Sequence, residues 1–191
     1  MILVTGSGRS GTSLMMQSLG LLGLPLAGVP FHDDFPVHEL NPKGYYDLPF
    51  NTMLLGVGKE YEGSVVKLFG KWLKQADHTI VSHVIVCRRK DTAAQDASLK
   101  NAFQKETQVR TASVVRAKFL ENIPEDCEYR RVRKNNYREV RNFTNKHTLP
   151  THTVWFEDFK EHPVTTLKDL TVFLGIEGVD LEDAINNVDN D

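Results

Sequence analysis

Residues 2–13 read Ile-Leu-Val-Thr-Gly-Ser-Gly-Arg-Ser-Gly-Thr-Ser, an apolar run that leads into a glycine-rich loop. Residues 2–5 predict a short buried strand, and the apolar residues of 13–22 recur at the spacing of a helix. Three glycines between a strand and a helix let successive backbone N–H groups turn toward an anion, with the positive end of the helix behind them. The sequence therefore predicts a phosphate-binding loop at residues 6–13.

The loop overlaps the phosphate loop of nucleoside triphosphatases, because Gly6 and Gly11 have its glycine spacing. That loop requires a lysine after the last glycine, where this chain has Thr12. The apolar run at 81–87 continues into Arg88 rather than into an aspartate that would hold magnesium. Hydrolysis of a nucleoside triphosphate is therefore not expected, and no metal site is predicted.

The same glycines also match the dinucleotide-binding pattern G-x-G-x-x-G. That pattern requires an acidic residue at the end of a second strand about twenty residues on. The candidates, Asp33 and Asp34, follow a segment interrupted by prolines. A dinucleotide-binding oxidoreductase stays an alternative interpretation of the loop.

The remaining sequence alternates between strand-like and helical patterns. Strands are expected at 81–87 and 151–156, and helices at 64–76, 91–105, 111–122, 125–147 and 163–174. Five prolines in residues 24–50 indicate a loop that crosses the top of the sheet. The alternation predicts an α/β fold of the P-loop type: a parallel sheet flanked by helices in three layers, with ligands at the carboxyl ends of the strands.

Composition narrows the class of protein. A chain of 191 residues is expected to form one domain over residues 1–191. Its 23 basic and 25 acidic residues give a formal charge of −2, so neither a nucleic-acid nor a membrane partner is expected. The two cysteines form no metal-binding or disulfide pattern, and neither a signal peptide nor a membrane span is predicted. These features favour a cytoplasmic protein.

Three segments, taken together, resemble the sulfotransferase family. Residues 4–14, Val-Thr-Gly-Ser-Gly-Arg-Ser-Gly-Thr-Ser-Leu, are similar to its 5′-phosphosulfate-binding loop, in which lysine or arginine occupies the Arg9 position. Residues 41–47, Asn-Pro-Lys-Gly-Tyr-Tyr-Asp, resemble a segment of the bacterial members. Residues 154–159, Val-Trp-Phe-Glu-Asp-Phe, and the helical pattern after them are similar to the family's C-terminal strand and helix. The three segments occur in the family's order.

The resemblance implies a donor, 3′-phosphoadenosine 5′-phosphosulfate (PAPS), and a product, 3′-phosphoadenosine 5′-phosphate (PAP). The sulfuryl group would pass by in-line displacement, without metal, to a hydroxyl or amine of an unknown small-molecule, carbohydrate or peptide acceptor. The loop residues expected to contact the donor are Gly8, Arg9, Ser10, Gly11, Thr12 and Ser13. Arg9 would also neutralise charge as the phosphosulfate bond breaks, which makes it a candidate catalytic residue.

The family grips the 3′-phosphate with an arginine that leaves a central strand and a serine in the following helix. Arg88 and Ser98 are the candidates in this chain. Their spacing is ten residues, whereas the family's is about eight, so Arg89 and Lys90 stay open as substitutes for Arg88. The alternative is that the three basic residues form a solvated cluster at the start of a helix.

Sulfuryl transfer requires a base for the attacking hydroxyl or amine. Asp47 closes the segment that resembles the family's and is the first candidate, although glutamate is commoner at this position. His32, beside two aspartates, is the second candidate. Glu157 and Asp158 are expected to cap a helix.

Two further features leave the activity open. Larger sulfotransferases often close over the nucleotide with a basic, glycine-rich C-terminal loop, whereas residues 186–191 of this chain are acidic. A non-catalytic nucleotide-binding module with the same fold is therefore a further alternative. The densest basic stretch, residues 130–141, could attract an anionic acceptor, but its charges fall on several sides of a helix and favour a solvated face.

Overall fold

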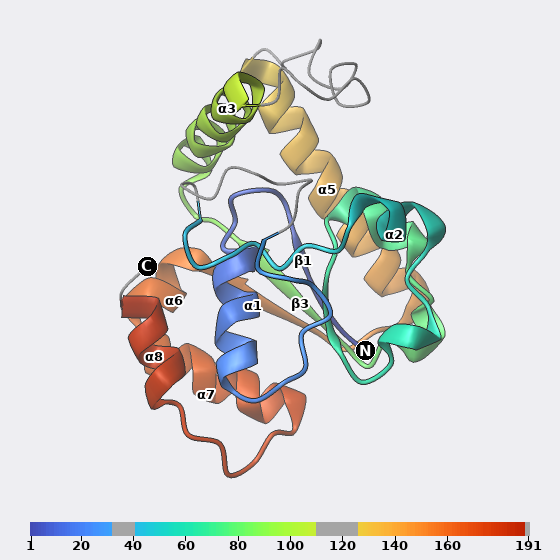
Figure 1. Cartoon of the computed structure of the whole chain (residues 1–191), viewed down its shortest axis with the longest axis vertical. Helices are drawn as coiled ribbons and strands as arrows, with labels where there is room; N and C mark the ends of the chain where they lie inside the picture. Colours follow the sequence, from blue (N-terminus) through green and yellow to red (C-terminus); the bar gives the residue numbers. More distant parts are fainter. Residues whose placement is uncertain (32–40, 110–125, 190–191) are drawn as a thin grey trace.

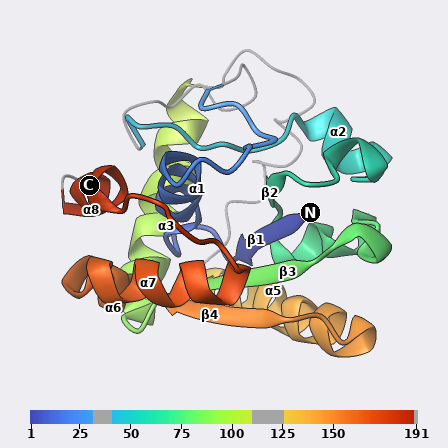
Figure 2. The ribbon, with the colours of Figure 1, turned by 90° about the horizontal axis from the view of Figure 1, so that it is seen from below.

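The computed structural model of the chain describes residues 1–31, 41–109 and 126–189. Within these residues the strands form one parallel sheet in the order β2-β1-β3-β4, and all four strands are labelled in Figure 2. The strands are β1 (Ile2–Gly6), β2 (Val65–Lys67), β3 (His83–Arg88) and β4 (Thr151–Trp155). β1 lies between β2 and β3, with Ile2 opposite Val65 on one side and His83 on the other. The predicted parallel α/β architecture is confirmed.

Helices cover both faces of the sheet (Figure 1). One face carries α1 (Thr12–Leu21), α6 (Phe156–Glu161), α7 (Pro163–Leu174) and α8 (Glu182–Asp189). The other carries α2 (Phe50–Leu55), the 3-10 helix η3 (Gly70–Gln75) and α5 (Asp126–His147). Shorter 3-10 turns, η2 (Lys59–Tyr61) and η4 (His78–Ile80), connect the strands. This arrangement gives the predicted three layers.

Successive side chains along the strands pack alternately into two separate hydrophobic cores, one on each face of the sheet. Val4, Ile85 and Cys87 join the core under α1, α7 and α8. Leu3 and Val86, which occupy the intervening positions, join the core under α5, η3 and α2. Because side chains of a strand alternate between faces, strands buried on both sides read as the nearly continuous apolar runs seen in this sequence.

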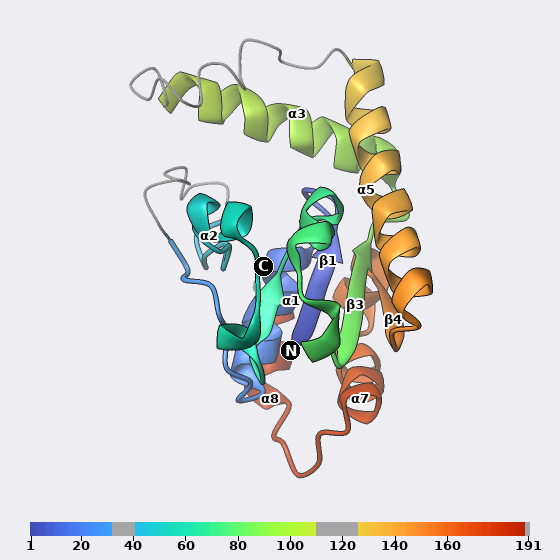
Figure 3. The ribbon, with the colours of Figure 1, turned by 90° about the vertical axis from the view of Figure 1, so that its right-hand side faces the viewer.

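α3 (Thr92–Val109) belongs to neither layer. It crosses above the carboxyl ends of the strands, where the loop after β1 also lies (Figure 3). β3 leads into α3 through residues 89–91, so α3 is placed where a ligand of a parallel sheet would bind. The position of α3 over the loop is the feature of the fold that shapes the candidate site.

α7 has the termini that its sequence predicts. Pro163 occupies the first turn, where its missing N–H has no partner to lose, and Gly175 follows the last turn at φ 66°. The predicted helices at 13–22, 91–105 and 125–147 are also confirmed as α1, α3 and α5, with shifted ends. The helix predicted at 111–122 lies outside the described residues.

The helix predicted at 64–76 is wrong. Val65–Lys67 forms β2, which pairs with β1, and only Gly70–Gln75 is helical, as a 3-10 turn. The apolar residues have mixed three- and four-residue spacing, which fits a helix locally. Pairing with β1 buries both Val65 and Val66 completely, on opposite faces of the sheet, and a single helix face would not do so. Tertiary pairing therefore overrides the local pattern.

Candidate functional site

The loop between β1 and α1 has a backbone that only glycine accommodates at two positions. Gly11 caps α1 in the left-handed region at φ 87°, and no side chain caps the first turn of the helix. A Cβ on Gly11 would lie 2.7 Å from Cδ2 of Phe156, and one on Gly6 would lie 2.6 Å from the carbonyl oxygen of Cys87. The loop is thus folded tightly against the start of α6 and the end of β3. A helix N-terminus whose N–H groups have no side-chain cap is suited to an anion.

The loop residues expected to contact a donor differ in exposure. Gly8, Arg9, Gly11 and Ser13 are partly exposed. Ser10 and Thr12 have buried side chains, so a ligand would meet these two residues through their backbone. Their assignment to the donor stays a prediction.

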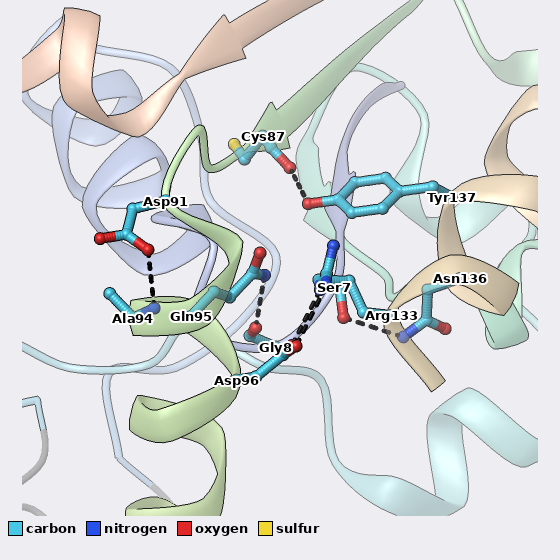
Figure 4. Close-up of polar contacts among 10 residues, drawn as sticks. All are labelled: Ser7, Gly8, Cys87, Asp91, Ala94, Gln95, Asp96, Arg133, Asn136 and Tyr137. Carbon is cyan, nitrogen blue, oxygen red and sulfur yellow. Dashed lines mark hydrogen bonds and ion pairs between the residues drawn. The ribbon is translucent and has the colours of Figure 1, made fainter. Parts of the chain in front are cut away.

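Two helices brace the loop from outside (Figure 4). Gln95 on α3 donates from Nε2 to the carbonyl oxygen of Gly8 at 2.9 Å. Asn136 on α5 donates from Nδ2 to Oγ of Ser7 at 3.3 Å. The two helices are joined to each other by a two-pronged ion pair between Arg133 and Asp96, with distances of 2.8 and 3.0 Å.

Arg9 is held by the same helix. Its Nε donates to Oγ of Ser98 on α3 at 3.0 Å, and its backbone has a positive φ of 61°. Arg9 and Ser98 therefore lie together at the loop, although Ser98 was predicted to pair with Arg88 at the 3′-phosphate. The structure brings these two predicted site residues into contact, in a combination that the sequence did not suggest.

A buried lysine lies beside the start of α1. Nζ of Lys67, at the end of β2, is 3.2 Å from Oγ of Ser13 and 3.1 Å from Oδ1 of Asp47, and it also donates to the carbonyl oxygen of Tyr45. Lys67 is 2% exposed and Asp47 4%. Burial lowers the pKa of Lys67; Asp47 opposes this shift, and the positive charge of Arg9 adds to it. Two cations, Arg9 and Lys67, are thus close enough at this loop to affect each other.

The segment at 41–47 is fastened along α1. Gln17 donates from Nε2 to the carbonyl oxygen of Gly44 at 3.0 Å and to Oδ1 of Asn41 at 3.4 Å. Lys43 donates from Nζ to the carbonyl oxygen of Asn187 in α8 at 2.8 Å. These contacts place Asp47 next to the loop through its partner Lys67. His32, the other candidate base, lies outside the described residues.

The three basic residues at 88–90, where β3 ends, have different environments. Arg88 is exposed, and its guanidinium lies over the rings of Tyr137 and Trp155, with Cζ 4.9 and 5.0 Å from their centroids. Arg89 lies over Phe156 and 3.7 Å from Oε1 of Glu157, whereas Lys90 pairs with Asp158. Arg88 thus lies against two aromatic rings, whereas Arg89 and Lys90 each contact a carboxylate.

Glu157 and Asp158 have a structural role, as expected, but it is not the expected role of capping a helix. Glu157 accepts from the backbone N–H groups of Lys90 at 2.9 Å and Asp91 at 3.2 Å. The N-cap of α6, Trp155, makes no side-chain capping bond. The two acidic residues thus tie α6 to the turn that leads into α3.

The basic stretch of α5 is divided between two sides of the helix. Arg133 turns inward to Asp96, whereas the other basic residues of the stretch are exposed: Arg130, Arg131, Lys134, Arg138 and Arg141. The first four of these exposed residues line an open groove of about 410 Å³. Asn136 and Tyr137 face the loop and β3 from the same helix, so the groove is on its outer side. The predicted solvated face is confirmed for these exposed residues.

Lys67, Gln95, Asn136 and Tyr137 contribute to the site and were not predicted from the sequence. The hydroxyl of Tyr137 donates to the carbonyl oxygen of Cys87 at 3.1 Å, and burial raises its pKa. Lys67 had one usable signal, a lysine at the end of the apolar run Val65-Val66. The other three lie on helices. No local sequence pattern indicates which side of such a helix faces a loop that is distant in the sequence.

Among known proteins, no family model and no curated protein matches the sequence. Among solved structures, the chain is similar to mouse sulfotransferase SULT7A1 complexed with PAP, with a TM-score of 0.48 and 16% sequence identity. The likeness covers 98% of this chain and 63% of that one, so the present chain spans less than two thirds of the mouse protein. Over the described residues, no helix combines the length and the apolar character needed to cross a bilayer.

Proposed function

We propose that this chain is a sulfotransferase that binds PAPS and transfers its sulfuryl group to a hydroxyl or amine. One observation carries the proposal: Arg9 and the buried Lys67 both lie at one glycine-rich loop. Arg9 belongs to the loop, and Lys67 contacts its last residue, Ser13. The sequence resemblance in residues 4–14, 41–47 and 154–159 supports it independently.

The residues present fit a phosphosulfate. The uncapped start of α1 supplies backbone N–H groups, and the missing side chain of Gly11 lets the loop pack against Phe156 without a clash. Arg9 supplies a charged fork, and Lys67 supplies a second cation whose pKa burial has lowered. An anion in this position would be stabilised by two positive charges at low dielectric.

The donor would supply the sulfuryl group, and the chain would supply binding, orientation and proton transfer. Arg9 would stabilise charge on the leaving phosphate, and Lys67 would attract the phosphosulfate toward Ser13. Asp47 is the proposed base, with His32 as the alternative. Arg88 would contact the 3′-phosphate, with Arg89 as the alternative, since its guanidinium fork suits a phosphate dianion. We take residues 1–191 as one domain.

Calorimetry with PAP, AMP and NAD tests the donor site. We expect PAP to bind more tightly than AMP, and NAD to bind weakly or not at all. Preferential binding of NAD would select the dinucleotide-binding oxidoreductase, and failure to bind any of the three would overturn the proposal. Turnover of PAPS against a panel of small-molecule, carbohydrate and peptide acceptors then separates an enzyme from a non-catalytic module.

Two glycine variants show whether the loop itself is the site. Gly11→Ala introduces a Cβ against Phe156 at a positive φ, so it should abolish PAP binding. Gly178→Ala is the matched control, because Gly178 also has a positive φ, of 70°, but has open space around its Cα. If Gly11→Ala is folded and still binds PAP normally, the nucleotide binds elsewhere.

A further inference from the structure

The outer side of α5 concentrates positive charge in a chain that is acidic as a whole. α5 holds seven of the 23 basic residues but only three of the 25 acidic ones. It runs along one edge of the molecule (Figure 3). Five of its residues line the open groove of about 410 Å³, which we call the outer groove: Arg130, Arg131, Lys134, Asn135 and Arg138. Because the formal charge of the chain is −2, this groove is a local exception.

The charges of the outer groove repel one another. Arg130 and Lys134 are four positions apart on the helix, as are Lys134 and Arg138, and like charges at this spacing destabilise a helix. Arg138 has Glu139 at 3.6 Å, but both side chains are about half exposed, so this ion pair offsets little of the repulsion. An anion bound among the cations would relieve the repulsion and stabilise α5.

The shape and the lining of the outer groove define the class of ligand. From residue 130 to residue 138 the helix rises by about 12 Å, and the volume of the groove is in the range of small-molecule sites. Arginine forks suit phosphate and sulfate groups. The lining contains neither an aromatic ring to stack a base nor an apolar side chain to enter a lipid layer. These features favour a small, soluble molecule with several phosphate or sulfate groups.

The turns of α5 that line the outer groove also brace the glycine-rich loop from their inner side. Arg133 is paired with Asp96 on α3, and Asn136 donates to Ser7 of the loop. Tyr137 contacts the end of β3. These inward residues are interleaved in the sequence with those of the outer groove. A ligand that stabilises these turns would therefore also stabilise the contacts that hold the loop.

We propose that the outer groove is a binding site for a small polyanion with phosphate or sulfate groups, and that the bound polyanion stabilises the part of α5 that braces the glycine-rich loop. This site is separate from the proposed donor site, which lies on the other side of the helix. The proposal does not require the chain to bind PAPS.

Calorimetry with inorganic tripolyphosphate tests the site, because this probe has several phosphates and no base. The groove variant combines Arg130→Gln with Lys134→Gln. Its matched control combines Lys59→Gln with Lys168→Gln, two exposed lysines on other elements, and has the same net charge. The groove variant should bind tripolyphosphate about 5–30-fold more weakly than the wild type, and the control should stay within about twofold. Equal losses in the two variants, or no loss in the groove variant, overturn the proposal.

An Arg9→Ala background separates the outer groove from the glycine-rich loop. Because the proposed donor site would also take an anion, the titrations are repeated in this background. The difference between the groove variant and the wild type should be unchanged there. If Arg9→Ala abolishes the binding of tripolyphosphate, the anion binds at the loop and the outer groove is not its site. Failure of PAP to bind overturns the proposed function alone, since these titrations do not depend on it.

Hydrogen exchange tests the effect on α5. At a tripolyphosphate concentration ten times its Kd, the backbone amides of residues 130–140 should exchange about tenfold more slowly in the wild type, because opening of the helix must release the ligand. The groove variant should show no such slowing at the same concentration. Binding that leaves the exchange of these amides unchanged overturns the stabilising role.

Two further probes test the size of the ligand. Vesicles that contain phosphatidylserine present anionic headgroups on a surface, and a single-stranded oligonucleotide presents phosphates along a chain. Both should bind more weakly per phosphate than tripolyphosphate and should not distinguish the groove variant from its control. Loss of vesicle or oligonucleotide binding in the groove variant, with tripolyphosphate binding unchanged, would assign the outer groove to a membrane or a nucleic acid and overturn the proposal.

Discussion

The carboxylate of Asp47 lies 3.1 Å from Nζ of Lys67, and both side chains are almost completely buried. The pair connects the 41–47 segment to β2 and lies beside Ser13 at the start of α1. Removing two charges from water is costly, and their attraction offsets this cost only while both are present. The pair is therefore expected to stabilise the fold at the place where the proposed site lies.

Asp47→Asn should lower the free energy of unfolding by about 3–5 kcal/mol, because it leaves the Lys67 charge buried without its counterion. Adding Lys67→Met should recover part of the loss, since the unpaired charge is then gone. Urea unfolding of the single and double variants measures both effects. Asp158→Asn is the control: its pair with Lys90 is about half exposed, so its loss should lower the free energy of unfolding much less. Equal losses of unfolding free energy at the two ion pairs would show that burial does not determine the contribution of the Asp47–Lys67 pair.

Asp47→Asn should also lower the chemical step by about 10²–10⁴-fold if Asp47 is the base. Single-turnover transfer from saturating PAPS, at a temperature where circular dichroism shows the variant folded, isolates this step. His32→Gln should have the smaller effect. Normal turnover by Asp47→Asn together with an inactive His32→Gln would move the assignment to the histidine.

Arg9→Ala should reduce turnover by about 10²–10³-fold, as expected when one preorganised donor to a developing charge is removed. The loss of unfolding free energy should be small beside the loss of turnover, because Arg9 is partly exposed and its bond to Ser98 contributes about 0.5–1.5 kcal/mol. Arg9→Lys keeps the charge and should retain part of the activity. Turnover that is insensitive to Arg9→Ala would remove Arg9 from the reaction.

Arg88→Ala should weaken PAP binding by about 1.5–3 kcal/mol and leave AMP binding nearly unchanged, because only PAP has a 3′-phosphate. Lys90→Ala is the matched control, since Lys90 is already paired with Asp158. Calorimetry with the two nucleotides gives the difference directly. Equal losses for PAP and AMP would show that Arg88 does not contact the 3′-phosphate.

Cys87 should be inert in the folded protein. Burial raises the pKa of its thiol from 9.0 to about 12, although the charge of Lys67 opposes the shift. In a Cys127→Ser background, Cys87 should not react with a chromogenic disulfide reagent at about pH 8, and should react fully once guanidinium chloride unfolds the chain. Rapid labelling of the native protein would contradict this burial.

The raised pKa of Cys87 also makes the free energy of unfolding depend on pH. The folded pKa is above the unfolded value, so the thiol favours folding below pH 9.0, and this contribution is lost as the pH rises toward about 12. Cys87→Ala should therefore show a smaller loss of stability than the wild type across this range. Urea unfolding at several alkaline pH values measures the difference.

The turn of the glycine-rich loop and the ends of α7 could be predicted from the sequence, because glycine and proline act through local backbone geometry. Gly11 adopts the left-handed conformation, and Pro163 and Gly175 mark the ends of their helix. β2 could not be predicted, because Val65 and Val66 become a strand only by pairing with β1, which is distant in the sequence.

Side-chain partners were the least predictable part of the site. The Arg9–Ser98 bond depends on how α3 crosses the sheet, and the Asp47–Lys67 pair depends on β2, which the helical interpretation of 64–76 concealed. Family spacing suggested Arg88 as the partner of Ser98, but sequence spacing does not state which side of a helix faces the loop. Long-range packing decides these contacts.

The central position of β1 affects how the protein is made. β1 is synthesised before both of its neighbours, and its partners begin only at Val65 and His83. The loop after it is braced by Gln95 and Asn136, and the 41–47 segment is anchored to Asn187. A nascent chain emerging from the ribosome thus exposes an apolar strand that is not fully paired until β3 has emerged, and the contacts around the glycine-rich loop are complete only when α5 and α8 are available. Such distant pairings favour slow folding, so binding competence should be among the last properties that the growing chain acquires.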